Sequence, residues 1–138
     1  MSNKSFYKEK LYKNEKIEVR KSEIHGYGVF AVSDIKKGEI LEECSYLRFI
    51  EGIDVNFLSY AFSWPKRDRH NINEEVKGAV LPFGYACIYN SSKDYETNNA
   101  DWETNEETNL FVFKAVKDIK ADTEILTYYG AAFWHHRQ

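Results

Sequence analysis

The sequence has little cysteine, proline or methionine, and it contains no long run of apolar residues. Its two cysteines, Cys44 and Cys87, form no CxxC pair, which argues against a cysteine zinc site and fits a reduced intracellular setting. We therefore expect two buried free thiols. Because a secretory signal and a membrane-length apolar segment are both missing, we also expect a soluble intracellular protein that does not bind membranes.

A strong positive charge is missing as well. The formal net charge is −3 and the isoelectric point is about 5.8, so the basic footprint of a direct nucleic-acid binder is absent. A mildly acidic protein suits basic partners such as lysine-rich tails. His25, His135 and His136 have no third and fourth ligand at zinc spacing, so we predict no metal site.

Aromatic residues, in contrast, make up 16% of the 138 residues, and 43% of residues are hydrophobic. This length predicts one domain, and the aromatic content favours strands. Apolar and polar residues alternate in several short segments, which predict strands over residues 17–20, 29–32, 39–50, 76–81, 100–104, 108–116 and 125–128. The first three would form two successive hairpins. With no alternating strand and helix units, we predict a mainly β, β-rich α+β domain.

The remaining segments are less regular. The Lys-rich residues 1–16 are expected to be a frayed leader or a short amphipathic helix, placing the folded domain at 17–138. Residues 34–39 and 117–124 are expected to be polar turns, and 83–90 a buried short helix or turn.

Three segments carry residues suited to binding and chemistry. In HGYGVFA, two glycines flank Tyr27, so the backbone there can turn tightly and approach a ligand. IYNSSKD supplies Asn90, whose amide can both donate and accept hydrogen bonds. EILTYYGAAFW places the phenol of Tyr129 where a strand ends at Gly130. The alternative for such a tyrosine is a packing role with a solvated hydroxyl.

Five segments in order, HGYGVFA, GEILEEC, YAFSW, GYACIYNSSKD and EILTYYGAAFW, resemble the SET-domain protein-lysine methyltransferases. The resemblance runs from Ile17 to Arg137 and is strongest to the compact viral and bacterial members. It implies a SET fold of several small sheets (a β-clip) with a C-terminal pseudoknot. That crossing would bring Asn90 beside Tyr129.

The resemblance also implies S-adenosylmethionine as cofactor and a lysine side chain as methyl acceptor. Tyr129 would be the catalytic residue. The cofactor would be bound by His25, Gly26, Tyr27, Gly28, Tyr60, Asn90, Ser91 and Trp134. The substrate channel would be lined by Tyr60, Phe62, Thr127 and Tyr129. The alternatives are a core strand position for Tyr60 and a hydrophobic tail anchor for Trp134.

Two positions depart from the family pattern. Ser91 stands where the family usually has histidine, and Thr127 stands where a Phe or Tyr often tunes the number of methyl groups added. The first departure motivates an alternative function, a non-catalytic SET-like module that binds a peptide or cofactor. A third reading is an unrelated small β domain.

The expected partner is a lysine-bearing protein, such as a histone or a ribosomal protein. Specificity would lie in the variable middle, at about residues 52–77. A homodimer would cover aromatic-rich surfaces, and the protein would act in the cytoplasm, or in the host nucleus if it is viral.

Overall fold

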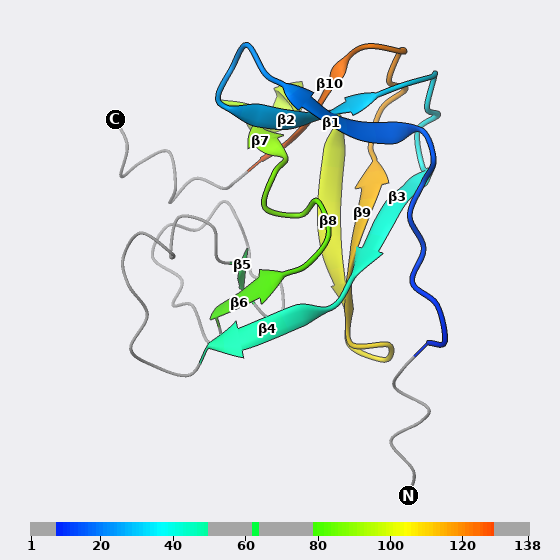
Figure 1. Ribbon diagram of the computed structural model, residues 1–138, viewed down its shortest axis with the longest axis vertical. Coiled ribbons are helices and arrows are strands. Elements are labelled where there is room, and N and C mark those ends of the chain that lie inside the picture. Colours follow the sequence, from blue (N-terminus) through cyan, green and yellow to red (C-terminus); the bar gives the residue numbers. More distant parts are fainter. Residues whose placement is uncertain (1–7, 50–61, 64–78, 129–138) are drawn as a thin grey trace, which may run out of the picture.

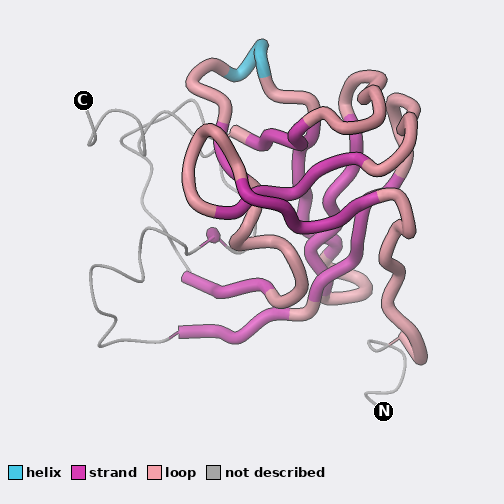
Figure 2. Tube along the Cα trace, turned by 45° about the horizontal axis from the view of Figure 1, so that its top comes forward, coloured by secondary structure: helices cyan, strands magenta, loops and turns pink. Residues whose placement is uncertain are grey.

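The computed structural model describes residues 8–49, 62–63 and 79–128. This part consists of short strands and loops with one short 3₁₀ helix, η2 (Tyr95–Thr97) (Figure 2). The strands form three small sheets, as predicted for a β-rich domain (Figure 1). The described helix is too short to cross a membrane, and residues 8–16 contain no helix.

The first sheet has four strands in the order β1-β2-β10-β7. They are β1 (Ile17–Lys21), β2 (Tyr27–Ala31), β10 (Glu124–Thr127) and β7 (Asn90–Ser91). β1 and β2 form the predicted hairpin, and β10 pairs antiparallel with the other edge of β2. This sheet lies across the upper ends of β8 and β9 in Figure 1. Segments from both ends and the middle of the chain therefore meet in it.

The second sheet has the order β3-β9-β8 and the third the order β4-β6-β5. Their strands are β3 (Ile40–Cys44), β9 (Leu110–Ala115), β8 (Ala100–Asn105), β4 (Tyr46–Phe49), β6 (Ala79–Pro82) and β5 (Phe62–Ser63). The buried core combines aliphatic side chains with three aromatic ones, Tyr89, Phe111 and Phe113. Tyr89 stacks on Phe113 with centroids 4.9 Å apart, and both side chains are fully buried.

Two predictions about the strands are wrong. The single strand predicted over 39–50 is two strands that belong to different sheets and are separated at Ser45. In the second sheet, Cys44 pairs with Phe111 near the start of β9, so the chain leaves that sheet and pairs with β6 instead. The second predicted hairpin also does not form, because β10 occupies the edge of β2 and β3 pairs with β9.

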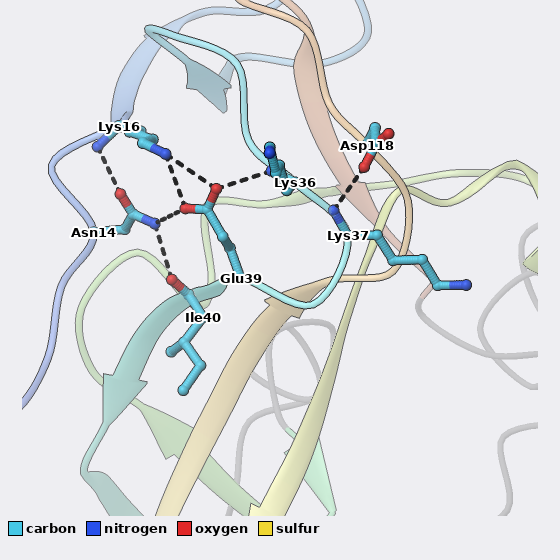
Figure 3. Close-up of polar contacts among 7 residues, drawn as sticks. All are labelled: Asn14, Lys16, Lys36, Lys37, Glu39, Ile40 and Asp118. Carbon is cyan, nitrogen blue, oxygen red and sulfur yellow. Dashed lines mark hydrogen bonds and ion pairs between the residues drawn. The ribbon is translucent and has the colours of Figure 1, made fainter.

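The two polar turns predicted at 34–39 and 117–124 lie side by side and brace each other. Ile35 and Ile119 exchange backbone hydrogen bonds of 2.7 and 2.8 Å. The two turns share the sequence Asp-Ile-Lys, and each aspartate caps the opposite turn. Asp34 accepts the N–H of Ala121. Asp118 accepts the N–H of Lys37, as Figure 3 shows. This pairing fixes the start of β10 relative to β2 and β3.

Glu39 closes the first of these turns (Figure 3). Its carboxylate accepts the backbone N–H of Lys36 at 2.9 Å, the ammonium of Lys16 at 3.0 Å and the amide of Asn14 at 3.2 Å. The hydrogen bond from Lys36, followed by that from Lys16, holds the pKa of Glu39 below its ordinary value. The segment before β1 is thus attached along β3.

Candidate functional site

Asn90 lies where the middle of the chain meets its last described strand. β7 runs parallel to β10, with Asn90 opposite Leu126 and Ser91 opposite Thr127. Ser92 extends the pairing by donating its N–H to the carbonyl of Thr127 at 2.8 Å. The Asn90 segment therefore lies beside β10, while the expected approach of Asn90 to Tyr129 concerns a residue outside the described part of the chain.

The side-chain amide of Asn90 connects this strand pair to the loop between β1 and β2. Its Nδ2 lies 2.7 Å from Oε2 of Glu124 and 3.2 Å from Oγ of Ser22. It also lies 3.1 Å from the carbonyl oxygen of His25 and 3.3 Å from that of Tyr27. Asn90 is 8% exposed, so these contacts are almost enclosed.

Glu124 and Ser22 complete this polar cluster. The second carboxylate oxygen of Glu124 accepts the Ser22 hydroxyl at 2.7 Å. Ser22 Oγ in turn accepts the backbone N–H of Ile24 at 2.9 Å and that of His25 at 3.3 Å. A hydrogen-bond network therefore runs from β10 and β7 into the 22–27 loop, which contains three of the eight predicted cofactor-binding residues, His25, Gly26 and Tyr27.

Gly26, in that loop, and Gly28, in β2, have different surroundings. Gly26 has φ +49°, a left-handed conformation that favours glycine, and a Cβ there would meet nothing within 4 Å. At Gly28 a Cβ would lie 2.1 Å from Oε2 of Glu124 and 3.0 Å from Nδ2 of Asn90. The backbone at Gly28 thus lies close to the side chain of Glu124. Close contact of the same backbone with a cofactor stays a prediction.

The other predicted site residues that the structure describes are split between surface and core. Tyr27 is 69% exposed, and His25 is exposed beside it. Ser91 is buried, and its hydroxyl donates to the carbonyl of Ser92 at 2.7 Å. Thr127 is 1% exposed, and Phe62 packs edge-on against Trp102 with centroids 5.0 Å apart. Roles in a cofactor pocket or substrate channel stay predictions for these residues.

Tyr60, Tyr129 and Trp134 lie outside the described residues. The catalytic, channel and adenine-covering roles assigned to them therefore stay predictions. β10 ends at Thr127, two residues before Tyr129 in the sequence.

Sequence reasoning did not single out Glu124, Ser22 or Asn99. Asn99 donates from its amide to the carbonyl of Glu124 at 3.0 Å and accepts the N–H of Leu126 at 2.8 Å, so it holds the outer side of β10. The polar residues 117–124 predict a turn that includes Glu124, and Asn99 likewise stands in a polar stretch. The available signal was the position of Glu124 at the first residue of an apolar strand, where an acidic side chain needs a partner.

A second polar cluster supports the chain just before Asn90. The buried carboxyl group of Glu42 accepts the hydroxyl of Tyr89 at 2.7 Å and the backbone N–H of Tyr85 at 3.1 Å. Burial, followed by the neighbouring Glu42, raises the pKa of Tyr89 well above its ordinary value. Burial also raises the pKa of the nearby Cys44 thiol, and it raises that of Cys87 to about 11.

Both cysteines are free thiols, with Cys44 buried and Cys87 partly buried. Within residues 8–49, 62–63 and 79–128, no group of three or more His, Cys, Asp or Glu side chains could hold a metal ion.

Comparison with known proteins places this arrangement in context. The family model of the SET domain matches residues 26–130. A proposed histone methyltransferase of Plasmodium falciparum is 32% identical, with a TM-score of 0.67 over 88% of this chain and 98% of that chain. The Neurospora SET domain protein DIM-5, a histone lysine methyltransferase, is 19% identical, with a TM-score of 0.58 over 82% of this chain and 51% of that chain.

A Polycomb repressive complex 2 from Chaetomium thermophilum, solved with bound S-adenosylmethionine, is 24% identical. Its TM-score is 0.59 over 85% of this chain and 15% of that chain. The similarity to this complex and to the Neurospora protein concerns the fold. No relative was found among curated protein sequences.

Proposed function

The chain belongs to the SET-domain family of protein-lysine methyltransferases, and we propose that it transfers a methyl group from S-adenosylmethionine to a lysine side chain of a protein substrate. The observation that carries this proposal is the position of Asn90. Its amide lies between the 22–27 loop and β10, and it connects the three segments that the resemblance assigns to the active site.

The residues around Asn90 fit a cofactor that carries an ammonium group and a sulfonium. Within the described part of the chain, Oδ1 of Asn90 has no hydrogen-bond partner and is not fully enclosed, so it can accept from an ammonium group. A Cβ at Gly26 would meet nothing within 4 Å, so the backbone there is open to a ligand. The exposed ring of Tyr27 offers a π face that attracts a cation. Asn90, Gly26 and Tyr27 are therefore the residues that we propose hold the cofactor.

The reaction is an in-line displacement, in which the new nitrogen–carbon bond forms as the carbon–sulfur bond breaks and its electron pair stays on sulfur. S-adenosylmethionine supplies the activated methyl group. The acceptor amine must be neutral, although only about one free lysine in a thousand is neutral near pH 7.4. An apolar channel beside a positive charge promotes proton loss to water, so a dedicated base is not needed. The protein's main task is alignment of the reacting atoms.

We assign this alignment to Tyr129, whose hydroxyl would lie near the acceptor nitrogen and the transferring methyl group. Weak C–H···O contacts to that hydroxyl are the supporting interactions. Tyr129→Phe should abolish methylation while the circular dichroism spectrum and thermal midpoint stay those of the parent. Unchanged turnover in this variant would remove Tyr129 from the mechanism.

The substrate class that we propose is a basic protein segment, with a histone tail as the first candidate. The net charge of −3 suits a lysine-rich partner, and the Plasmodium and Neurospora proteins described above are a proposed and a named histone methyltransferase. Ribosomal proteins form the second group of substrates to be screened.

The proposal is tested by calorimetric titration with S-adenosylmethionine and S-adenosylhomocysteine, with and without lysine-rich peptides. We expect binding that is weakened in Asn90→Ala, followed by transfer of labelled methyl groups to lysine. Absence of binding under all of these conditions would refute the proposal. Cofactor binding without transfer to any histone or ribosomal protein would instead support the non-catalytic module.

A further inference from the structure

We infer that Glu124 is a positioning residue, which fixes the orientation of Asn90 and of the 22–27 loop so that the amino-acid part of the methyl donor can be held. This inference rests on the proposed function. Glu124 is the first residue of β10 and is partly buried. Its two carboxylate oxygens bind two different side chains, Asn90 through Oε2 and Ser22 through Oε1, each at 2.7 Å.

The orientation of the Asn90 amide follows from the chemistry of its neighbours. Three of them, the carboxylate of Glu124 and the carbonyls of His25 and Tyr27, can only accept hydrogen bonds. The fourth, Ser22 Oγ, gives its proton to Glu124 and accepts backbone N–H groups. Only the NH₂ side of the amide can face this set, because a flipped amide would place oxygen against oxygen. Oδ1 must therefore point away from Glu124.

Both oxygens of Glu124 act on the same loop by different routes. Through Ser22, the carboxylate orders the N–H groups of Ile24 and His25. Through Asn90, it orders the carbonyls of His25 and Tyr27. Ser22 thus accepts hydrogen bonds from the N–H groups of the loop, and Asn90 donates hydrogen bonds to its carbonyl groups. Glu124 contacts both of these side chains.

The backbone is shaped to admit this carboxylate. A Cβ at residue 28 would lie 2.1 Å from Oε2 and 2.9 Å from Cδ of Glu124, so any side chain there would displace the carboxyl group. Gly28 thus lets Glu124 reach Asn90 from across the β2–β10 pair. The GYG motif predicts that other groups can come close to the backbone, and at Gly28 this closeness is needed for the contact between Glu124 and Asn90.

The charge of Glu124 gives the arrangement a chemical consequence. Donation of N–H to a carboxylate polarises an amide and makes its carbonyl oxygen a better acceptor. A negative charge behind Asn90 also favours a positively charged ligand group in front of it. Glutamine at position 124 would lose this charge, and its own NH₂ would face either the NH₂ of Asn90 or the hydroxyl of Ser22.

The experiment compares two ligands that differ by the amino-acid part. S-adenosylhomocysteine carries the ammonium and carboxylate groups, and 5′-methylthioadenosine lacks both. In calorimetric titrations, Glu124→Gln should weaken S-adenosylhomocysteine binding by about tenfold or more, since hydrogen bonds to charged groups are the strong ones. Binding of 5′-methylthioadenosine should change less than about threefold. A general loss of structure would weaken both ligands alike.

Ser22→Ala is the second variant, because it removes one donor and keeps the contact between Glu124 and Asn90. It should weaken S-adenosylhomocysteine by a smaller factor, about threefold, with the same selectivity between the two ligands. Glu106→Gln, a substitution of an exposed glutamate in the β8–β9 turn, is the matched control and should change neither affinity.

Equal loss for both ligands, or no loss for either, in the two test variants would overturn the role of Glu124. The proposed function fails in a different way, which is seen in the wild-type protein. If wild type binds and methylates but Glu124→Gln behaves identically, only the inference about Glu124 is lost. If wild type binds neither ligand under any condition, the proposed function is lost as well.

Discussion

Two glutamates, Glu42 on β3 and Glu124 on β10, each lie against a glycine and each accept hydrogen bonds from a hydroxyl group and from an N–H group. Glu42 is 2% exposed and binds Tyr89 and the backbone of Tyr85, close to Gly84. Glu124 binds Ser22 and Asn90 close to Gly28, beside a loop whose Tyr27 ring is exposed.

The difference lies in what each carboxyl group supports. The partners of Glu42 belong to the core, where Tyr89 stacks on Phe113 and has no access to a ligand. The partners of Glu124 extend to the protein surface through the 22–27 loop. The arrangement around Glu42 thus stabilises the core, whereas by our proposal the similar arrangement around Glu124 supports ligand binding. The surroundings of each carboxyl group determine its role.

The largest expected effect comes from removing the deeper carboxyl group. Glu42→Ala removes the carboxyl group that accepts from the buried Tyr89 hydroxyl and from the Tyr85 N–H, so we expect a loss of about 3 kcal/mol or more in the free energy of unfolding. Glu124→Ala should cost about 1–2 kcal/mol, because its site is partly solvated. Urea denaturation measures both, and a larger loss for Glu124→Ala would reverse the comparison.

A moderate effect is expected for Tyr89→Phe, about 1–2 kcal/mol at pH 8, because Glu42 loses one donor. The raised pKa of Tyr89 adds a dependence on pH. An unfolded tyrosine titrates near pH 10, so the stability linked to the protonated phenol is complete below that pH and falls as the pH rises above it. Denaturation midpoints between pH 8 and 11 should therefore fall more steeply for wild type than for Tyr89→Phe.

Cys87, with its pKa raised to about 11, loses stability over part of the same range in both proteins, so the difference between them isolates Tyr89. Parallel curves for the two proteins would mean that the phenol titrates in the folded state as it does in the unfolded chain.

The smallest effect is expected at Glu39, a carboxylate whose side chain is 28% exposed and paired with a Lys16 side chain that is 40% exposed. Glu39→Gln should cost less than about 1 kcal/mol, since partly solvated ion pairs contribute little. Its lowered pKa means that the contribution is present above the unfolded value near 4.3 and disappears as the pH falls through the folded value. Wild type and variant should therefore converge in acid denaturation below pH 4.

Much of the fold could be predicted from local patterns. The alternation in residues 17–20, 100–104 and 108–116 corresponds to β1, β8 and β9, and the two Asp-Ile-Lys segments are turns as expected. The division of residues 39–50 could not be predicted, because each half alternates equally well. The break between β3 and β4 depends on where the partner strand β9 begins, and β9 lies about 65 residues further along the chain.

The candidate site shows the same limit. Asn90 and the loop glycines were found because the resemblance names their motifs, and the parallel pairing of β7 with β10 agrees with it. The contact between Glu124 and Ser22 could not be predicted, because one sequence does not show which residues 102 positions apart are partners. Their contact exists only after β10 has added to the edge of β2.

The position of β10 between β2 and β7 also bears on how the protein is made. During synthesis on the ribosome, the β1–β2 hairpin emerges about a hundred residues before β10, which pairs with the free edge of β2. Until then, the edge of β2 is an open template to which another nascent chain could add a strand. Because the decisive pairings join distant segments, folding should be slow, and crowded expression should favour aggregation through this edge.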